Sequence, residues 1–145
     1  MLKGRFGDTS RRPYLEGRLL IPRVSADANI SFCVDTGADS TVLMPADGIT
    51  MNLDYNELTL GSRPSVGFGG ITYPYEEEAV LIFIEPGHAI HVYRISLIIS
   101  QPEADLLGLP SVLGRDILNQ WRMRYSPQTG NLTFDVLKAD YTQLL

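Results

Sequence analysis

The most informative stretch of the sequence is Phe32-Cys33-Val34-Asp35-Thr36-Gly37-Ala38-Asp39-Ser40-Thr41-Val42-Leu43. Residues 29–34 alternate between apolar and polar side chains, which predicts a strand that runs directly into Asp35. Gly37 permits a close backbone approach in the turn that follows, because it carries no Cβ. A carboxylate at the end of an apolar strand is poorly solvated, as catalytic acids and bases often are. Asp35 is therefore a candidate catalytic residue, although many Asp-x-Gly sequences are ordinary turns.

Strand patterns also dominate the rest of the chain. Short runs of alternating side chains are separated by turn residues, and Pro86 and Gly87 predict a hairpin between two of these runs. One segment, residues 114–121, carries apolar side chains at helical spacing. Many short strands and one helix predict an all-β domain, with the strands in a closed or nearly closed barrel. The expected strands are residues 14–21, 29–34, 71–84, 91–99, 121–125 and 132–136.

The size and charge of the chain limit its function. With 145 residues it fits a single domain, residues 1–145, because two folded units would each be too small. The net charge of -5 argues against a nucleic-acid partner, which requires a basic surface. Residues 1–13 contain several basic side chains and are expected to form a solvated N-terminal extension. Residues 122–145 are expected to form a C-terminal hairpin and tail.

Several other classes of protein are not supported by the sequence. The longest apolar run, residues 79–84, is too short to span a membrane, and residues 1–13 contain no apolar leader. We therefore expect no membrane contact and a cytoplasmic location. His88 and His91 are the only histidines and lack the paired spacing of a zinc site, so no metal or other cofactor is expected. Cys33, the only cysteine, is expected to act as a small apolar residue.

The stretch around Asp35 is similar to the active-site sequence of the retropepsins, the retroviral-type aspartic peptidases. Two further segments resemble motifs of that family, in the same order along the chain. Gly67-Phe68-Gly69-Gly70-Ile71 resembles the glycine-rich tip of the family's flap. Val112-Leu113-Gly114-Arg115-Asp116-Ile117-Leu118 resembles the apolar pair and glycine that lead into its single helix. The resemblance implies a retropepsin-like closed β-barrel with a flap hairpin and one short helix on the C-terminal side.

The same resemblance implies an aspartic endopeptidase that works as a homodimer. In such an enzyme one carboxylate removes a proton from a water molecule while a second supplies a proton to the peptide carbonyl. Two carboxylates in contact share one proton and titrate as a pair. Asp35 would supply one carboxylate and its copy in a second chain the other. The alternative within one chain, Asp8-Thr9-Ser10, follows no apolar strand and lacks the glycine. The implied partners are a peptide or protein substrate and a second copy of the chain.

The resemblance also assigns supporting residues to the active-site loop. Thr36 would brace the two loops across the dimer axis, and Gly37 would offer its carbonyl oxygen to the substrate. Asp39 and Arg115 would form an ion pair that ties the loop to the start of the helix. Gly114 would let the chain that precedes it pass beneath the loop. The support residues implied in this way are Thr36, Gly37, Ala38, Asp39, Gly114 and Arg115.

The glycine-rich segment would act as a lid over a bound peptide. Phe68 would lie at its tip, and the neighbouring glycines would supply the mobility that a lid requires. A peptide beneath it would be extended and held by main-chain hydrogen bonds. Phe68, Ile71 and Val112 favour apolar substrate residues on either side of the cleaved bond. The implied flap and substrate-binding residues are Gly67, Phe68, Gly69, Gly70, Ile71 and Val112, and an ordinary hairpin without a lid function is the alternative.

The chain departs from the family pattern in three places. The segments before residue 14 and after Trp121 are longer than in the viral members, so no residue of their dimer interface is carried over. Pro74 lies in the strand that leaves the flap, where it removes a ladder hydrogen bond. The run Glu76-Glu77-Glu78 that follows is expected to lie at a solvated edge.

Two other functions are considered beside the peptidase. A binding or adaptor module could keep the fold without catalysis, since fold does not imply function. Such a module has no need of a carboxylate at position 35, which favours the peptidase. A hydrolase that uses Asp35 as a phosphoryl or metal site would require further acidic and lysine partners, which the motif lacks.

Overall fold

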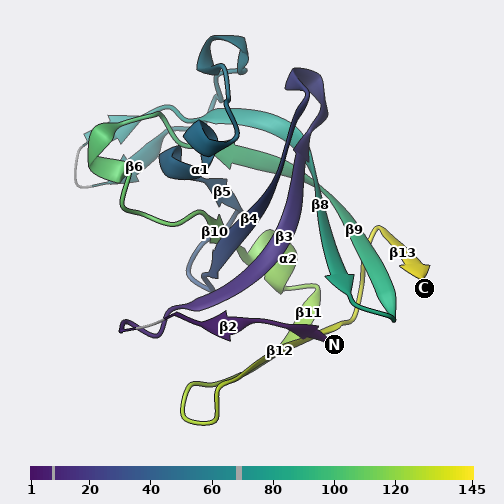
Figure 1. Ribbon diagram of the computed structural model, residues 1–145. Helices are drawn as coiled ribbons and strands as arrows, with labels where there is room; N and C mark the ends of the chain where they lie inside the picture. The colour runs from purple at the N-terminus through teal and green to yellow at the C-terminus, as the bar shows by residue number, and fades with distance from the viewer. Residues whose placement is uncertain (8, 68–69) are drawn as a thin grey trace.

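Six strands pair in a closed ring and form a β-barrel (Figure 1). The computed structural model describes residues 1–7, 9–67 and 70–145. The barrel strands are β3 (Pro13–Ile21), β4 (Ala26–Val34), β5 (Val42–Leu43), β8 (Tyr75–Glu85), β9 (Ala89–Ile99) and β10 (Val112–Leu113). Around the ring, β3 pairs with β4, β4 with β10, β10 with β5, β5 with β9, β9 with β8, and β8 with β3. The all-β closed barrel expected from the sequence is confirmed.

The barrel core follows from the alternation of side chains along these strands. Leu113 lies opposite Val34, and Leu43 lies opposite Ile99. All four side chains are buried, whereas the residue before each of them is only partly buried. A slip of one residue would turn this apolar set outward, so the alternation fixes the register of the strands.

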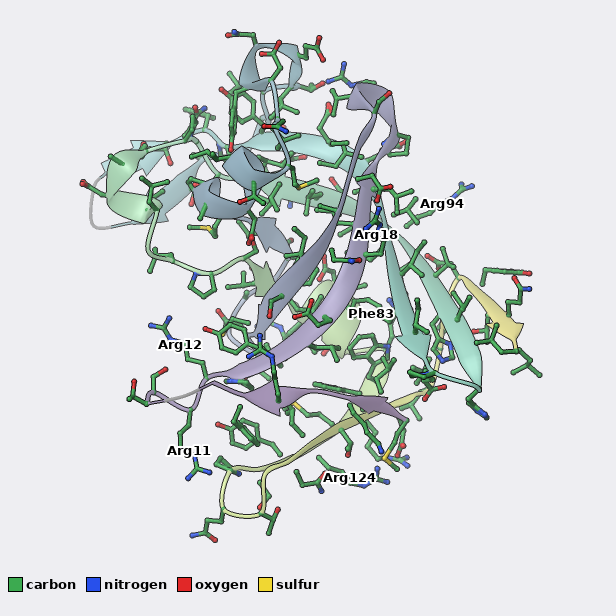
Figure 2. The ribbon with its side chains drawn as sticks, viewed as in Figure 1. Arg11, Arg12, Arg18, Phe83, Arg94 and Arg124 are labelled. Atoms are coloured by element: carbon green, nitrogen blue, oxygen red, sulfur yellow. The ribbon has the colours of Figure 1, made fainter. Side chains whose placement is uncertain are left out.

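Aromatic side chains join the barrel to a second sheet. The ring of Trp121 packs edge-on against Phe83, Tyr93 and Phe134, at centroid distances of 4.9, 6.0 and 5.2 Å. Figure 2 shows Phe83 between β3 and β8. The Tyr93 hydroxyl accepts a hydrogen bond from Trp121 Nε1 and donates one to the carbonyl oxygen of Lys138, both at 2.7 Å. These bonds satisfy the polar atoms that the aromatic cluster buries.

The second sheet includes the N-terminal residues, which were expected to be a solvated extension. Its strand order is β1 (Leu2–Lys3), β12 (Asn131–Val136) and β11 (Trp121–Ser126). Leu2 is 2% exposed, and β2 (Arg5–Phe6) pairs with β3. The basic side chains of Lys3 and Arg5 are exposed as expected, but the backbone of residues 2–6 is paired in strands, which are too short to show a periodic pattern in the sequence. The hairpin expected after Trp121 is present as β11 and β12.

Short elements that the sequence pattern did not reveal complete the fold. The helix expected on the C-terminal side is present as α2 (Arg115–Leu118), and a second short helix, α1 (Pro45–Thr50), follows β5. Pro74 ends the expected strand of residues 71–84 early, and the chain divides there into β7 (Gly70–Thr72) and β8. Strand β6 (Ser65–Gly67) pairs with β7, and β13 (Tyr141–Leu144) pairs with β9. The 3₁₀-helices are η1 (Pro22–Val24), η2 (Tyr55–Glu57) and η3 (Ala104–Leu106).

Glu77 is buried and ion-paired, in contrast to the solvated position expected for the run of glutamates. Its two carboxylate oxygens accept hydrogen bonds from Arg23 Nε at 2.9 and 3.0 Å, and Thr59 Oγ1 donates a third at 2.9 Å. Arg23 also donates to the carbonyl oxygen of Glu57 at 2.6 Å. Burial alone would raise the pKa of Glu77, but the bonds from Arg23 and Thr59 outweigh it and hold that pKa below its usual value. The cluster therefore fixes the loop after η2 to strand β8.

We expect Arg23→Met to destabilise the fold by about 3 kcal/mol, because it leaves the carboxylate of Glu77 buried without its cation. A carboxyl whose pKa is lowered in the folded state contributes stability above its unfolded-state pKa and loses it as the pH falls through its folded-state pKa. The deficit of the variant should therefore shrink on acidification. Urea unfolding from pH 7 down to pH 3 measures this change.

The exposed neighbour Glu78 supplies the matched control, since Glu78→Gln should change the free energy of unfolding by less than about 0.5 kcal/mol. Equal effects of the two substitutions at pH 7 would contradict a stabilising role for the Arg23–Glu77 pair.

Candidate active site

Asp35 follows the last residue of β4 and begins a tight loop. Its backbone N–H donates to the carbonyl oxygen of Leu113 at 3.0 Å, which continues the pairing of β4 with β10 for one more residue. The backbone N–H of Gly37 donates to Asp35 Oδ1 at 2.9 Å, and that of Ala38 donates to the carbonyl oxygen of Asp35 at 3.2 Å. Asp35 is partly buried, while Thr36 and Gly37 are exposed. The loop thus orients one carboxylate oxygen from its own backbone and leaves the adjacent residues accessible.

Gly114 lies directly against the loop that carries Asp35. A Cβ at position 114 would be 2.5 Å from both the carbonyl carbon and the oxygen of Ser40. The backbone N–H of Arg115 also donates to the carbonyl oxygen of Ala38 at 2.9 Å. Strand β10 can therefore lie between β4 and β5 because the residue that follows it is glycine. This contact is the one that the sequence resemblance implied for Gly114.

Arg115, the first residue of α2, binds the same loop through its guanidinium group. Its Nη1 donates to the carbonyl oxygen of Thr36 at 2.7 Å, and its Nη2 forms an ion pair with Asp39 Oδ1. The ion pair expected between Asp39 and Arg115 is therefore present. Asp39 is largely exposed, so its ion pair with Arg115 contributes little to the stability of the protein. The main effect of the planar guanidinium is to hold the Thr36 carbonyl and the Asp39 carboxylate in fixed orientations.

Thr41 and Asp116 form a further bond set that the sequence reasoning did not identify. Asp116 Oδ1 accepts from Thr41 Oγ1 at 2.8 Å, and Asp116 Oδ2 accepts from the backbone N–H of Thr41 at 2.9 Å. Gly114 donates its backbone N–H to Thr41 Oγ1 at 3.2 Å. Thr41 is fully buried, which makes these bonds hard to replace by water. The only signals for these bonds in the sequence are the hydroxyl of Thr41, next to the apolar residues Val42 and Leu43, and the carboxylate of Asp116, next to Arg115.

The glycine-rich segment is a hairpin, as far as the structure describes it. Ser65 lies opposite Thr72, Val66 opposite Ile71, and Gly67 opposite Gly70. Gly70 has a φ of +104°, a conformation that other residues rarely adopt. Ile71 is 67% exposed. The expected tip residues Phe68 and Gly69 lie outside the described residues.

An open hollow of about 400 Å³ surrounds Asp35. Val34, Met123 and Tyr125 give it apolar walls, and Thr36 completes its edge beside Asp35. Tyr125 is 51% exposed and packs edge-on against Phe6 at 5.2 Å. The described residues that line this hollow include no second carboxylate. Two nearby arginines, Arg11 and Arg12, precede β3 and point away from the barrel (Figure 2).

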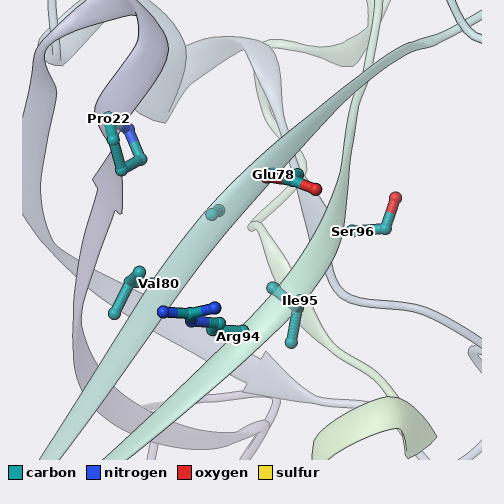
Figure 3. Close-up of a pocket in the computed structure, with 7 residues that line it drawn as sticks. Pro22, Glu78, Val80, Arg94, Ile95 and Ser96 are labelled. Carbon is teal, nitrogen blue, oxygen red and sulfur yellow. The ribbon is translucent and has the colours of Figure 1, made fainter.

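Another cavity lies away from Asp35, on the outer side of β8 and β9 (Figure 3). It has a volume of about 540 Å³ and is lined by η1, β8 and β9, with Glu78 and Arg94 as its charged residues. No part of the Asp35 loop or of the segment around Gly114 contributes to it. Its one carboxylate, Glu78, and its one hydroxyl, that of Ser96, have no histidine beside them in the lining, so the cavity offers no paired acid and base.

Within the described part of the chain, no group of three or more histidine, cysteine, aspartate or glutamate side chains is arranged to hold a metal ion. No helix in residues 1–7, 9–67 and 70–145 is long and apolar enough to cross a membrane.

The arrangement of barrel, hairpin and Asp35 loop is a retropepsin-like fold. The crystal structure of a retropepsin-like aspartic protease from Rickettsia conorii superposes with a TM-score of 0.57 and 17% sequence identity, covering 100% of this chain and 92% of that chain. The EIAV protease in complex with the inhibitor HBY-793 superposes with a TM-score of 0.50 and 19% identity, covering 78% of this chain and 90% of that chain. No protein-family model matches the chain, and no curated protein matches it in sequence. At these identities the likeness establishes the fold.

We expect Gly114→Ala to destabilise the protein by about 3 kcal/mol or to prevent folding, because the added methyl group would overlap the backbone of Ser40. Gly108→Ala is the matched control, since a Cβ there meets nothing within 4 Å. Thermal unfolding followed by circular dichroism compares the two. A Gly114→Ala protein as stable as the Gly108→Ala protein would contradict the packing of β10 beneath the loop.

Proposed function

We propose that two copies of this chain form an aspartic endopeptidase whose active site contains Asp35 from each copy. The observation that carries the proposal is the placement of Asp35. Its carboxylate is oriented by the N–H of Gly37, lies at an open hollow, and has no second carboxylate among the described residues of that hollow. A half-site of this kind is completed by a two-fold axis that brings the same residue from a second copy.

The chemistry follows from two carboxylates that share one proton. The ionised carboxylate takes a proton from a water molecule as the water oxygen attacks the carbonyl carbon of the peptide bond. The protonated carboxyl gives its proton to the carbonyl oxygen, which forms a tetrahedral diol. Transfer of a proton to the amide nitrogen and cleavage of the C–N bond then release an amine and a carboxylic acid. This route needs no metal or other cofactor.

The surrounding residues have supporting roles in this proposal. Thr36 is exposed beside Asp35, where its hydroxyl can bond to the loop of the second copy. The carbonyl of Gly37 and the hairpin β6–β7 offer backbone hydrogen bonds to an extended peptide. Gly114, Ala38 and the Asp39–Arg115 pair hold the loop in place. The lid function of the hairpin and a cytoplasmic location both stay predictions.

A binding module with the same fold is the second candidate. Its best support is that a single chain offers one carboxylate at the hollow around Asp35. The two candidates differ in one property, since a peptidase requires dimerisation for activity and a binding module does not.

We expect Asp35→Asn to abolish cleavage of an unfolded protein substrate, measured by mass spectrometry, while folding is retained. Mixing the wild type with a tenfold excess of Asp35→Asn should lower activity about tenfold after subunit exchange, because most wild-type chains then face an asparagine. Asp27→Asn, at the other end of the same strand, is the matched control and should neither lose activity nor inhibit. Inactivity of a wild-type dimer towards unfolded proteins would favour the binding module, and an unaffected mixture would exclude a shared site.

The pH dependence of kcat/KM should be bell-shaped with its maximum on the acid side. Activity requires one proton on the carboxylate pair, so it falls when both are protonated and when both are ionised. Initial rates from pH 3 to pH 9, with the fold monitored by circular dichroism, measure the profile. A constant rate across this range would argue against the carboxylate pair.

A further inference from the structure

A second hollow next to the active-site strands combines an apolar floor with an acidic side. This cavity of about 490 Å³ lies between the hairpin β6–β7, strand β5 and the segment that follows β9. Val42, Met44 and Ile98 are among its apolar lining residues. Its two charged lining residues are Glu103 and Asp105, at and inside the 3₁₀-helix η3. The volume is large enough for a long side chain.

A continuous row of side chains connects this cavity to the active-site strand. Cys33 lies opposite Val112, Val112 opposite Val42, and Val42 opposite Ile98. Side chains of directly opposed residues lie on the same face of a sheet, so this row shares one face. By the alternation of β4, Asp35 emerges on the face of Cys33. The cavity floor therefore continues the surface on which Asp35 lies.

The cavity is close enough to Asp35 to contact a side chain of a peptide whose cleaved bond lies at Asp35. Strands β4 and β5 are separated by one strand, β10, and therefore by about 10 Å at the usual strand spacing. An extended peptide advances about 3.3 Å per residue. The cavity thus lies within about three residues of a peptide bond held at Asp35.

The described residues that line the cavity include no lysine, arginine or histidine. Residues 95–114 contain no lysine, arginine or histidine, and Glu103 and Asp105 are their only charged residues. Neither carboxylate forms an ion pair with any residue that the structure describes. Both residues are exposed, so their charges lie at the protein surface where they line the cavity.

We propose that this cavity receives a lysine or arginine side chain of the peptide substrate, within about three residues of the cleaved bond. The inference rests on the proposed peptidase function and names its substrate class. The methylene stem of such a side chain packs along Val42 and Ile98, and its charged head reaches Glu103 and Asp105, as long basic side chains do at the edges of apolar surfaces. An acidic side chain in the same place is repelled. The apolar preference expected from Ile71 and Val112 is thus modified by a charged rim.

The test uses peptides that differ at one position. Starting from a peptide that the wild type cleaves, each residue within three of the cut is replaced in turn by lysine, methionine or glutamate. At one of these positions we expect kcat/KM for lysine to exceed that for methionine by roughly fivefold to tenfold, as two partly exposed ion pairs would give. The preference should decrease as the salt concentration rises, because exposed charges are screened.

Variants then assign the preference to the cavity. The double variant Glu103→Gln/Asp105→Asn should cleave the lysine and methionine peptides equally. The charge-matched control Glu16→Gln/Asp27→Asn removes two exposed carboxylates from β3 and β4 and should keep the preference. Glu103→Lys should favour the glutamate peptide. A lysine preference that survives in Glu103→Gln/Asp105→Asn, or no preference in the wild type, overturns the inference.

A binding measurement separates this inference from the peptidase proposal. If the wild type cleaves no peptide, the proposed function fails, but the Asp35→Asn protein can still be titrated with fluorescent lysine and methionine peptides and followed by anisotropy. Tighter binding of the lysine peptide that is lost in Asp35→Asn/Glu103→Gln/Asp105→Asn supports a basic-residue cavity. Equal binding of the two peptides, or no binding of either, rejects it.

Discussion

The close contact between Gly114 and the backbone of Ser40 is the constraint on which the site depends. Because glycine follows β10 directly, the strand can lie between β4 and β5, and the strand pairing then brings the Asp35 loop and helix α2 together. The buried hydrogen bonds between Thr41 and Asp116 stabilise the contact between the loop and the helix, and the exposed hydrogen bond from Arg115 to the carbonyl oxygen of Thr36 adds to it. These contacts fix the backbone of the loop at several points, as the proposed catalysis would require.

Charged residues of this protein act in two different environments. Glu77 is buried and its charge is matched by Arg23, so it contributes to the shape of the barrel and of the loop beside it. Glu103 and Asp105 are exposed beside a cavity and have no cation in the residues around them, so they are available to a ligand. In the sequence, Glu77 cannot be told apart from Glu103 and Asp105. The structure distinguishes them, because Glu77 is buried against Arg23 whereas the other two are exposed.

The sequence predicted the elements that have either a long pattern or a motif. The long barrel strands β3, β4, β8 and β9, the hairpin after Trp121 and the ion pair of Asp39 with Arg115 belong to this group, whereas the two-residue barrel strands β5 and β10 do not. It did not predict β1, β2 or α1, because two to six residues are too few for a period to appear. It also misplaced Glu77, since a glutamate is buried only when a distant residue such as Arg23 pairs with it, and that pairing is set by the fold. The tip of the hairpin at Phe68 stays a prediction.

Strand β13 adds backbone pairing to β9 with side chains that are all exposed, so it contributes little to the core. The carbonyl oxygen of Lys138, bound by Tyr93, and the carboxylate of Asp140, which accepts from the N–H of Arg94, guide the chain into this position. An uncovered strand edge offers unpaired N–H and C=O groups to any other extended chain and promotes unspecific sheet-to-sheet association. Because β13 covers residues 89–92 of β9, the open edge of the sheet there belongs to β13, and the segment 138–144 determines which backbone groups another chain would meet.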